Sequence, residues 1–364
     1  MTPPSQRGNP TVADALARPA NGFAAVRLGL ALAVVVSHAF SVTSGRIADE
    51  PLHRATGFTL GEHAVNGFFA ISGFLVTMSF VRRGARDYAV ARALRIAPGF
   101  VAATLAVTFG LGLGLTHLSA PDYLGDPATW RFVQMTLTTF KSNAALPGLF
   151  AENPFRFPMG TVWTLKYEVL CYLGVLAAGL VGALRPGWFP VALVGALLLA
   201  NLGLPLLHAD PPLGLVTALR LPFVFAAGAA LYLWRKRISL SGPAALGLVL
   251  VAAALSSTFA YQALLLVATA YGIVWLSFSP ALARPAFAWN TDLSYGTYLY
   301  GWPIQQALRQ AFPTASSLFL LAPALVLTLA LAALSWRFVE GPALTLKARI
   351  LRPVRPPSSA PAPP

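Results

Sequence analysis

Residues 23–43 read FAAVRLGLALAVVVSHAFSVT, an apolar run of membrane-spanning length with two ionisable side chains, Arg27 and His38. About 20 apolar residues cross a bilayer as a helix. At about 100° per residue, the eleven steps from Arg27 to His38 return to within roughly 20° of one direction, about 16 Å further along the axis. An ionisable group inside a bilayer is costly unless it is paired or faces a polar cavity. The run therefore predicts a polar stripe through the membrane.

The composition of the chain is that of a helical membrane protein with several spans. Of 364 residues, 56% are hydrophobic and 10% are charged, and the mean hydropathy is +0.65. Soluble domains carry about 25% charged residues. The net charge of +14 would suggest a nucleic-acid partner for a soluble protein. Here the basic residues gather in loops on one side, so we interpret them as topology signals and expect no nucleic-acid partner.

The apolar runs predict an all-α fold, a polytopic membrane bundle of about ten transmembrane helices. The predicted spans lie near 23–43, 63–81, 94–115, 162–183, 188–207, 214–234, 242–258, 260–279, 292–311 and 317–338. Placing most Lys and Arg in the cytoplasm puts both termini there. Arg27 then lies near the inner end of the first span and His38 near its outer end.

Three regions follow from this arrangement. We expect a polar cytoplasmic segment at 1–21, a membrane domain at 22–345 and a basic, Pro-rich, disordered cytoplasmic tail at 346–364. The longest connection between spans, 116–161, lies on the outer side and holds an amphipathic run at 130–140.

Three ionisable side chains in the predicted spans are candidates for catalysis: His38, Glu168 and Arg27. Histidine is the usual general base near neutral pH. Glu168 belongs to a span that starts outside, so we expect it at a depth similar to that of His38, where a carboxylate can orient an imidazole. The structural alternatives are an interfacial histidine, a snorkelling anchor for Arg27 and an ordinary ion pair for Glu168.

A basic segment follows the second span, with arginines at 82, 83 and 86 and then Arg92 and Arg95. Arg92 and Arg95 are i, i+3 and share a helix face, and guanidinium groups suit phosphate. They are candidates for binding a phosphate-bearing donor at the cytoplasmic face. The alternative, a positive-inside anchor, explains residues 82–86 better than it explains these two.

Two apolar segments carry polar side chains. Residues 65–75, VNGFFAISGFL, contain Asn66 and Ser72, while Gly67 and Gly73 favour close helix packing. Residues 292–306, DLSYGTYLYGWPIQQ, offer a polar face that suits a sugar-like acceptor and contain Pro303, which predicts a kink. An aromatic belt on a kinked packing helix is the alternative. The predicted acceptor-binding residues are Asn66, Ser72, Trp163, Tyr295, Tyr298, Trp302 and Gln305.

The remaining motifs are structural or absent. Arg337 and Glu340 are i, i+3 and are expected to pair with each other at the inner interface. The sequence contains no H-E-x-x-H, no Cys/His cluster, no Walker A motif and no G-x-S-x-G, so we expect no metal ion. Cys171 lies in an apolar run without a basic neighbour, which makes it a poor nucleophile.

Taken in order, these segments resemble the acyltransferase family 3 integral-membrane proteins, which acylate surface carbohydrates. The resemblance extends over about residues 22–345. It rests on Arg27 and His38 with ten residues between them, GFFAISGFL at 67–75, RALRIAP at 92–98, Trp163-Thr164-Leu165 with Glu168, Ser294-Tyr295 through Tyr298-Leu299, Trp302-Pro303 and Glu340-Gly341-Pro342. Each piece is short, but the ordered set is specific.

The resemblance implies an O-acyltransferase of the bacterial inner membrane that moves an acetyl group from cytoplasmic acetyl-CoA to a glycan or glycolipid. It implies that Arg27 and His38 are essential, with His38 as the base, and that Arg92 and Arg95 help to bind the acyl-CoA. We include Arg27 in this donor site. A pantetheine arm that reaches through the bundle, or an acyl-enzyme relay, would carry the acyl group to His38.

Two positions depart from the family pattern. Gly301 stands where a His often precedes the Trp-Pro pair, and Asn66 stands where an Asp often precedes the paired Phe. The alternative function is a transporter or flippase for a glycan or lipid-linked intermediate, against which the lack of an internal repeat counts. Membrane lipid is a partner in either case. The patterns leave open the acceptor, the acyl group (acetyl, succinyl or longer) and the oligomeric state.

Overall fold

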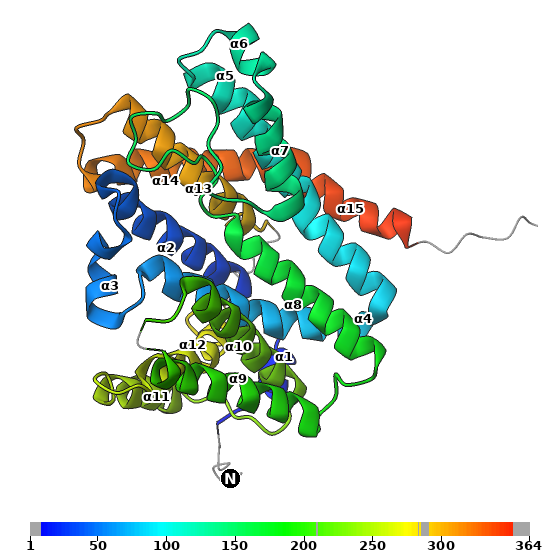
Figure 1. Cartoon of the computed structure of the whole chain (residues 1–364). Coiled ribbons are helices and arrows are strands. Elements are labelled where there is room, and N and C mark those ends of the chain that lie inside the picture. Colours follow the sequence, from blue (N-terminus) through cyan, green and yellow to red (C-terminus); the bar gives the residue numbers. More distant parts are fainter. Residues whose placement is uncertain (1–8, 209, 283, 285–290, 352–364) are drawn as a thin grey trace, which may run out of the picture.

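The computed structural model describes residues 9–208, 210–282, 284 and 291–351, and the helices within this part of the chain account for all its regular elements (Figure 1). The long helices are α2 (Phe23–Ser44), α4 (Leu60–Leu105), α8 (Trp163–Leu180), α9 (Trp188–Leu207), α10 (Leu213–Leu233), α11 (Gly242–Ala254), α12 (Tyr261–Ser277), α13 (Ser294–Ala311) and α14 (Ser317–Ser335). The others are α1 (Val12–Leu16), α3 (Pro51–Thr56), α5 (Gly112–Leu115), α6 (Ala120–Gly125), α7 (Pro127–Thr139) and α15 (Gly341–Ile350). The all-α prediction is confirmed for these residues.

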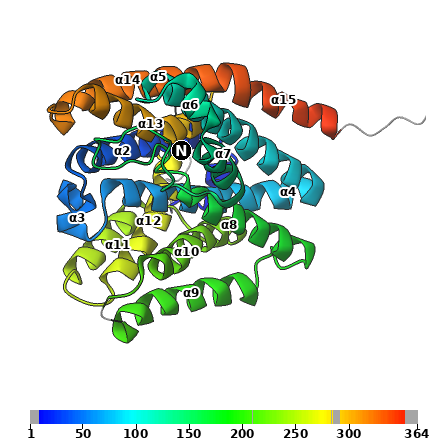
Figure 2. The ribbon, with the colours of Figure 1, turned by 45° about the horizontal axis from the view of Figure 1, so that its top comes forward.

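The helices form a bundle with α2, α4, α10 and α13 at its centre. α10 packs along α4, and α13 packs against both α2 and α14. α14 and α15 lie along one edge of the bundle and α9 along the opposite edge, with α2 and α13 between them (Figure 2). Four segments far apart in the sequence therefore meet in the interior.

α4 contains both the predicted span at 63–81 and the start of the predicted span at 94–115. It begins at a capping box in which Thr59 and Glu62 satisfy each other's backbone N–H groups. Gly84 interrupts the helical geometry with φ 80° and ψ 175°, a conformation that favours glycine, and this kink separates the two halves. A π-helical segment, Ala106–Leu111, then leads into α5.

The packing of α4 on α10 depends on glycine. A Cβ atom at Gly73 would lie 1.9 Å from the backbone oxygen of Phe225, and one at Gly228 would lie 2.0 Å from the oxygen of Ala70. The two backbones therefore approach each other directly, which is the small-residue packing expected of membrane helices. The packing interpretation of Gly73 is confirmed.

Within the described residues, five helical stretches are long and apolar enough to cross a membrane. They are Phe23–Ser44, Leu60–Leu115, Trp188–Leu207, Leu213–Leu233 and Ser317–Ile350. α11 and α12 are apolar but shorter, and α8 and α13 carry polar side chains that lower their hydropathy. The count of ten spans and the cytoplasmic position of both termini stay predictions.

α9 shows how the bundle meets lipid. Only Pro190 and Leu204 of this helix are buried, whereas Leu199 and Leu207 are 69% and 80% exposed. An apolar helix edge of this kind suits a hydrocarbon environment, because lipid satisfies its side chains and the helix satisfies its own backbone.

The connection 116–161 covers one end of the bundle, where α5, α6 and α7 gather (Figure 1). The predicted amphipathic run at 130–140 is α7, which ends at Phe140 in the left-handed conformation. Further along, Phe150 and Met159 are fully buried against the bundle. This connection is thus part of the core and supplies one wall of a cavity described below.

The C-terminal boundary needs a correction. We predicted a disordered tail at 346–364, but α15 continues to Ile350, and Lys347 Nζ donates to Asp87 Oδ1 at 2.8 Å. This ion pair fixes the end of α15 on α4. The rest of the predicted tail, 352–364, and residues 1–8 of the N-terminal segment lie outside the described residues.

Candidate active site

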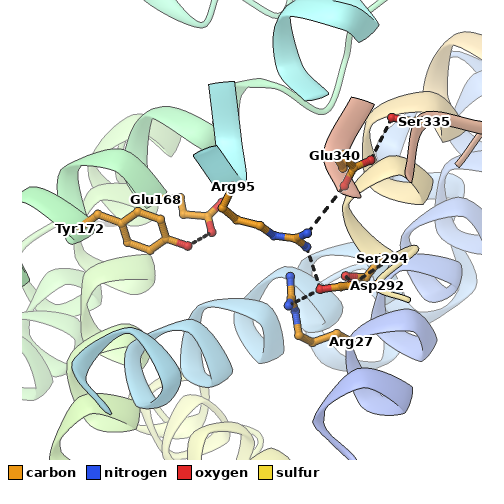
Figure 3. A network of polar contacts seen from close by, with 8 residues as sticks. All are labelled: Arg27, Arg95, Glu168, Tyr172, Asp292, Ser294, Ser335 and Glu340. Atoms are coloured by element: carbon orange, nitrogen blue, oxygen red, sulfur yellow. Dashed lines mark hydrogen bonds and ion pairs between the residues drawn. The ribbon is translucent and has the colours of Figure 1, made fainter. Parts of the chain in front are cut away.

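An ion cluster joins four helical segments near the start of α13 (Figure 3). Asp292 Oδ2 accepts from Arg27 Nη1 at 2.6 Å and from Arg95 Nη2 at 2.8 Å. The other carboxylate oxygen accepts from the hydroxyl and backbone N–H of Ser294, at 2.5 and 3.1 Å. One carboxylate thus pairs with two arginines, so that neither arginine carries an unpaired charge within the bundle.

Glu340 is the fourth charge of the cluster. Its carboxylate is 2% exposed, lies 3.6 Å from Arg95 Nη1 and accepts from Ser335 Oγ at 2.9 Å. It ends a π-helical segment, Trp336–Glu340, and such segments often lie at functional sites. The predicted pairing of Arg337 with Glu340 is wrong, because the wider π turn directs Glu340 inward, and Arg337 instead lies over the ring of Phe338 at 5.6 Å.

Arg92 and Arg95 do not act as one pair. The guanidinium of Arg92 lies 5.6 Å from the ring centre of Tyr172, on α8, while Arg95 reaches toward Asp292 and Glu340. Arg92 Nε is buried and has no hydrogen-bond partner among the described residues. The i, i+3 spacing put both side chains near one face, but their neighbours on α8 and α13 separate the two head groups.

Glu168 lies away from His38. It accepts a short hydrogen bond from the hydroxyl of Tyr172, one turn further along α8, and it stands beside Arg95 in Figure 3. It lines the same cavity as Arg27, whereas His38 lines a different one. The predicted Glu168–His38 dyad is therefore absent from this structure, because similar depth in the membrane does not place two side chains on facing sides of the bundle.

Two cavities lie in sequence along the polar stripe of α2. The cavity at the Arg27 end of the stripe, which we call the inner cavity, has a volume of about 50 Å³, and its lining includes Arg27, Arg95, Glu168, Ser72 and Tyr295. The outer cavity has a volume of about 680 Å³, and its lining includes His38, Trp163, Lys166, Phe157 and Trp302. Val65 and Tyr298 belong to the walls of both. Arg27 and His38 thus lie on one stripe of α2 but line different cavities.

The environment of His38 is aromatic. Its ring meets the ring of Trp302 edge-on, with 5.0 Å between centres, and none of the described residues forms a hydrogen bond with the imidazole. Trp302 is held in turn, since it stacks on Phe157 at 5.2 Å and donates from Nε1 to the Phe157 carbonyl at 2.8 Å. The free imidazole nitrogens are therefore available to a molecule in the outer cavity.

The other predicted acceptor residues divide between cavity walls and packing. Tyr295 donates its hydroxyl to the Ile96 carbonyl at 2.9 Å while its ring lines the inner cavity. Asn66 is fully buried, and its amide has no partner in the part of the chain that the structure describes. Gln305 donates from Nε2 to the Val35 carbonyl at 2.6 Å, so it joins α13 to α2 and lines neither cavity.

The two departures from the family pattern also fall here. A Cβ atom at Gly301 would lie 2.7 Å from Val35 Cγ2. A larger residue at this position requires the Val35 side chain to shift, so the glycine matches the close packing of α13 on α2 seen here.

Sequence reasoning missed Asp292, the centre of the ion cluster. It stands two residues before the first residue of α13. An acidic residue at the border of an apolar run was the available signal, but its two arginine partners are 265 and 197 residues away in sequence.

A second buried ion pair, also not predicted, lies at the outer cavity. Arg220 is 2% exposed and donates to Glu62 Oε1 at 3.1 Å, and its guanidinium lies 4.9 Å from the ring centre of Phe58. Because Glu62 also caps α4, this pair connects α10 to the start of α4. No group of three or more potential metal ligands occurs among the residues searched, which are those the structure describes.

Comparison with known proteins identifies the family of the chain. A family model described as an acyltransferase domain matches residues 21–337. The chain belongs to acyltransferase family 3. This membrane acyltransferase is 29% identical to an O-acetyl transferase of Shigella phage Sf6 over 341 residues, covering 89% of the chain and 96% of that relative. It is 28% identical to nodulation protein 10 of Rhizobium leguminosarum bv. viciae over 375 residues, covering 91% and 95%. No solved structure matches the chain.

Proposed function

We propose that this acyltransferase resides in the bacterial inner membrane and moves an acetyl group from cytoplasmic acetyl-CoA to a hydroxyl of a surface or exported glycan. Family membership supports acyl transfer, and the O-acetyl transferase among its relatives supports an acetyl group and an oxygen acceptor. The observation that carries the proposal is the position of His38. Its imidazole has no hydrogen-bond partner among the described residues and lines a cavity of about 680 Å³.

His38 is proposed as the general base. Its neutral imidazole takes the proton of the acceptor hydroxyl while the hydroxyl oxygen attacks the carbonyl carbon of the thioester. The carbon–sulfur bond then breaks, the acyl group stays on the acceptor oxygen, and the departing thiolate receives the proton. Trp302 fixes the imidazole against one wall, so the ring is oriented before the acceptor binds.

The donor is proposed to enter from the side of the inner cavity. Arg27 and Arg95 already have carboxylate partners, so we propose that they hold α2, α4 and α13 together along the path of the donor more than they bind phosphate. Arg92 has a buried Nε without a partner among the described residues and is the better candidate for a phosphate of the donor.

The acceptor is proposed to occupy the outer cavity. Its walls combine aromatic rings, among them Trp163, Tyr167 and Trp302, with a few polar side chains such as Lys166. Small-molecule sites have this composition, with apolar and aromatic walls and few polar groups that fix orientation. The apolar faces of a sugar ring pack on such aromatic side chains.

The test is CoA release and acetyl transfer by the purified protein in detergent, with acetyl-CoA and a crude surface-glycan extract. The H38A variant should lose at least about 100-fold in rate, the lower range of a general base's contribution, and R92A should raise the KM for acetyl-CoA. H117A is the matched control, because His117 is exposed and lines neither cavity.

Full activity of a correctly folded H38A variant would refute the mechanism. Wild-type protein that releases no CoA, with or without the extract, would refute the acetyl-CoA donor and favour transport of a glycan or lipid-linked intermediate. Each variant is first checked for a single symmetric peak in size-exclusion chromatography, so that misfolded protein is not read as inactive protein.

A further inference from the structure

Two side chains, Val65 of α4 and Tyr298 of α13, lie where the two cavities adjoin, and we call them the partition. They are the residues common to the walls of both cavities. Arg27 lines the inner cavity and His38 the outer one, so an acyl group that moves from the donor side to His38 passes the place where Val65 and Tyr298 lie.

Tyr298 is held firmly in the partition. Its hydroxyl lies 2.6 Å from Thr164 Oγ1 and donates to the Thr161 carbonyl at 3.1 Å. Thr161 Oγ1 in turn donates to the Tyr298 carbonyl at 3.2 Å. The ring of Phe68 meets the Tyr298 ring edge-on at 6.1 Å. The aromatic side of the partition is therefore fixed by hydrogen bonds to the start of α8.

Val65 forms the aliphatic side. It is 7% exposed and belongs to α4. Because valine is branched at Cβ, its side chain has one strongly preferred rotamer in a helix and cannot swing aside as a longer chain would. Both sides of the partition are consequently stiff.

The inner cavity is small. A volume of about 50 Å³ corresponds to a few water molecules at roughly 10–15 Å³ of the same measure for each. An acetyl group, with three heavy atoms, fits a space of that size, and a longer acyl group in this cavity comes closer to Val65 and Tyr298. The outer cavity is more than ten times larger, 680 against 50 Å³, and sets no such limit.

We infer that Val65 and Tyr298 determine the length of the acyl group that this enzyme transfers, and that they select acetyl. The inference rests on the proposed function and adds the specificity-determining residues to it. One methylene in a tight apolar site changes specificity by about 10- to 200-fold. The wild-type protein should therefore prefer acetyl-CoA over propionyl-CoA by at least about 10-fold, and over butyryl-CoA by more.

The experiment compares kcat/KM for acetyl-, propionyl- and butyryl-CoA, measured by CoA release in the presence of the surface-glycan extract. V65A opens the partition and should reduce the acetyl-to-butyryl preference by about 10-fold or more. V65I narrows it and should increase the preference. Y298F keeps the ring but removes the hydroxyl that anchors it, and should reduce the preference several-fold.

Two matched controls distinguish the partition from general packing. V76A removes the same two methyl groups from α4, at a residue that is 1% exposed and lines neither cavity. Y88F removes a buried hydroxyl that donates to the Tyr172 carbonyl at 2.8 Å. Both should change stability and leave the acetyl-to-butyryl ratio unchanged, because a structural defect lowers the rates with all three donors in parallel.

An unchanged ratio in V65A and V65I, with wild-type CoA release intact, would overturn the inference and leave the proposed function standing. A ratio that shifts equally in V76A would also overturn it. No CoA release by the wild type with any of the three donors would refute the proposed function and the inference together.

Discussion

Replacing Asp292 by asparagine removes the charge on which the inner ion cluster depends. Asp292 holds Arg27 at 2.6 Å and Arg95 at 2.8 Å, and the three side chains are 21%, 23% and 12% exposed. Removing one partner of a buried ion pair costs about 3–5 kcal/mol, because the remaining charge stays in a poorly solvated site. Asp292→Asn should therefore destabilise the protein.

The expected magnitude lies at the lower end of that range. The amide oxygen of the D292N side chain still accepts one hydrogen bond, and Arg95 keeps Glu340 at 3.6 Å. Arg27 pairs with no second carboxylate among the described residues. We expect a loss of about 3 kcal/mol, measured by denaturation of the detergent-solubilised protein with an added denaturant.

Asp49→Asn is the matched control. Asp49 pairs with Arg46 at 2.8 Å, but Arg46 is 73% exposed, and exposed ion pairs contribute little to stability because water screens them. The double variant R27Q/D292N should lose less than the sum of the two single variants, because it leaves no unpaired guanidinium. A loss in D292N no larger than that in D49N, or strict additivity in the double variant, would refute the role assigned to this cluster.

Two further substitutions test the packing of the central helices. Gly73→Ala should lower the free energy of unfolding by about 1–3 kcal/mol, since its Cβ would meet the Phe225 oxygen at 1.9 Å. Its control, Gly174→Ala, has no atom within 4 Å of the new Cβ and should stabilise α8 by up to about 1 kcal/mol. Equal effects of the two variants in the same denaturation assay would contradict the close approach. Gln305→Met should lower the free energy of unfolding by about 1 kcal/mol, because it removes the hydrogen bond to the Val35 carbonyl, and should leave the KM for the acceptor unchanged. A raised KM without loss of stability would show that Gln305 binds the acceptor.

The helices were predictable because their signals are local. The apolar run at 23–43 carries its own length and periodicity, and it became α2 with one further residue. The amphipathic run at 130–140 likewise became α7. The continuation of α15 past residue 346 was missed because the residues that follow are rich in proline, which predicts disorder for the whole segment. The last turn of α15 is instead fixed by the ion pair of Lys347 with Asp87, a residue of α4 that lies far away in sequence.

The partners within the site were not predictable, because they come from helices that only folding brings together. Spacing within one helix placed Arg92 and Arg95 near one face, but Tyr172 of α8 and Asp292 separate their head groups. Spacing also suggested that Glu340 pairs with Arg337, its neighbour in sequence, and a π turn directs it to Arg95 instead.

The sequence by itself determined that this chain is a helical membrane protein of acyltransferase family 3 and that Arg27 and His38 share a stripe of the first long helix. Hydropathy, helical period and short motifs are local signals that can be recognised within a few helical turns of sequence. Only the tertiary structure decided that Arg27 and His38 line two different cavities, with Val65 and Tyr298 in the walls of both, and that Glu168 belongs to the inner cavity. Lateral packing of α4, α8 and α13 sets those neighbours, and depth along a single helix does not contain that information.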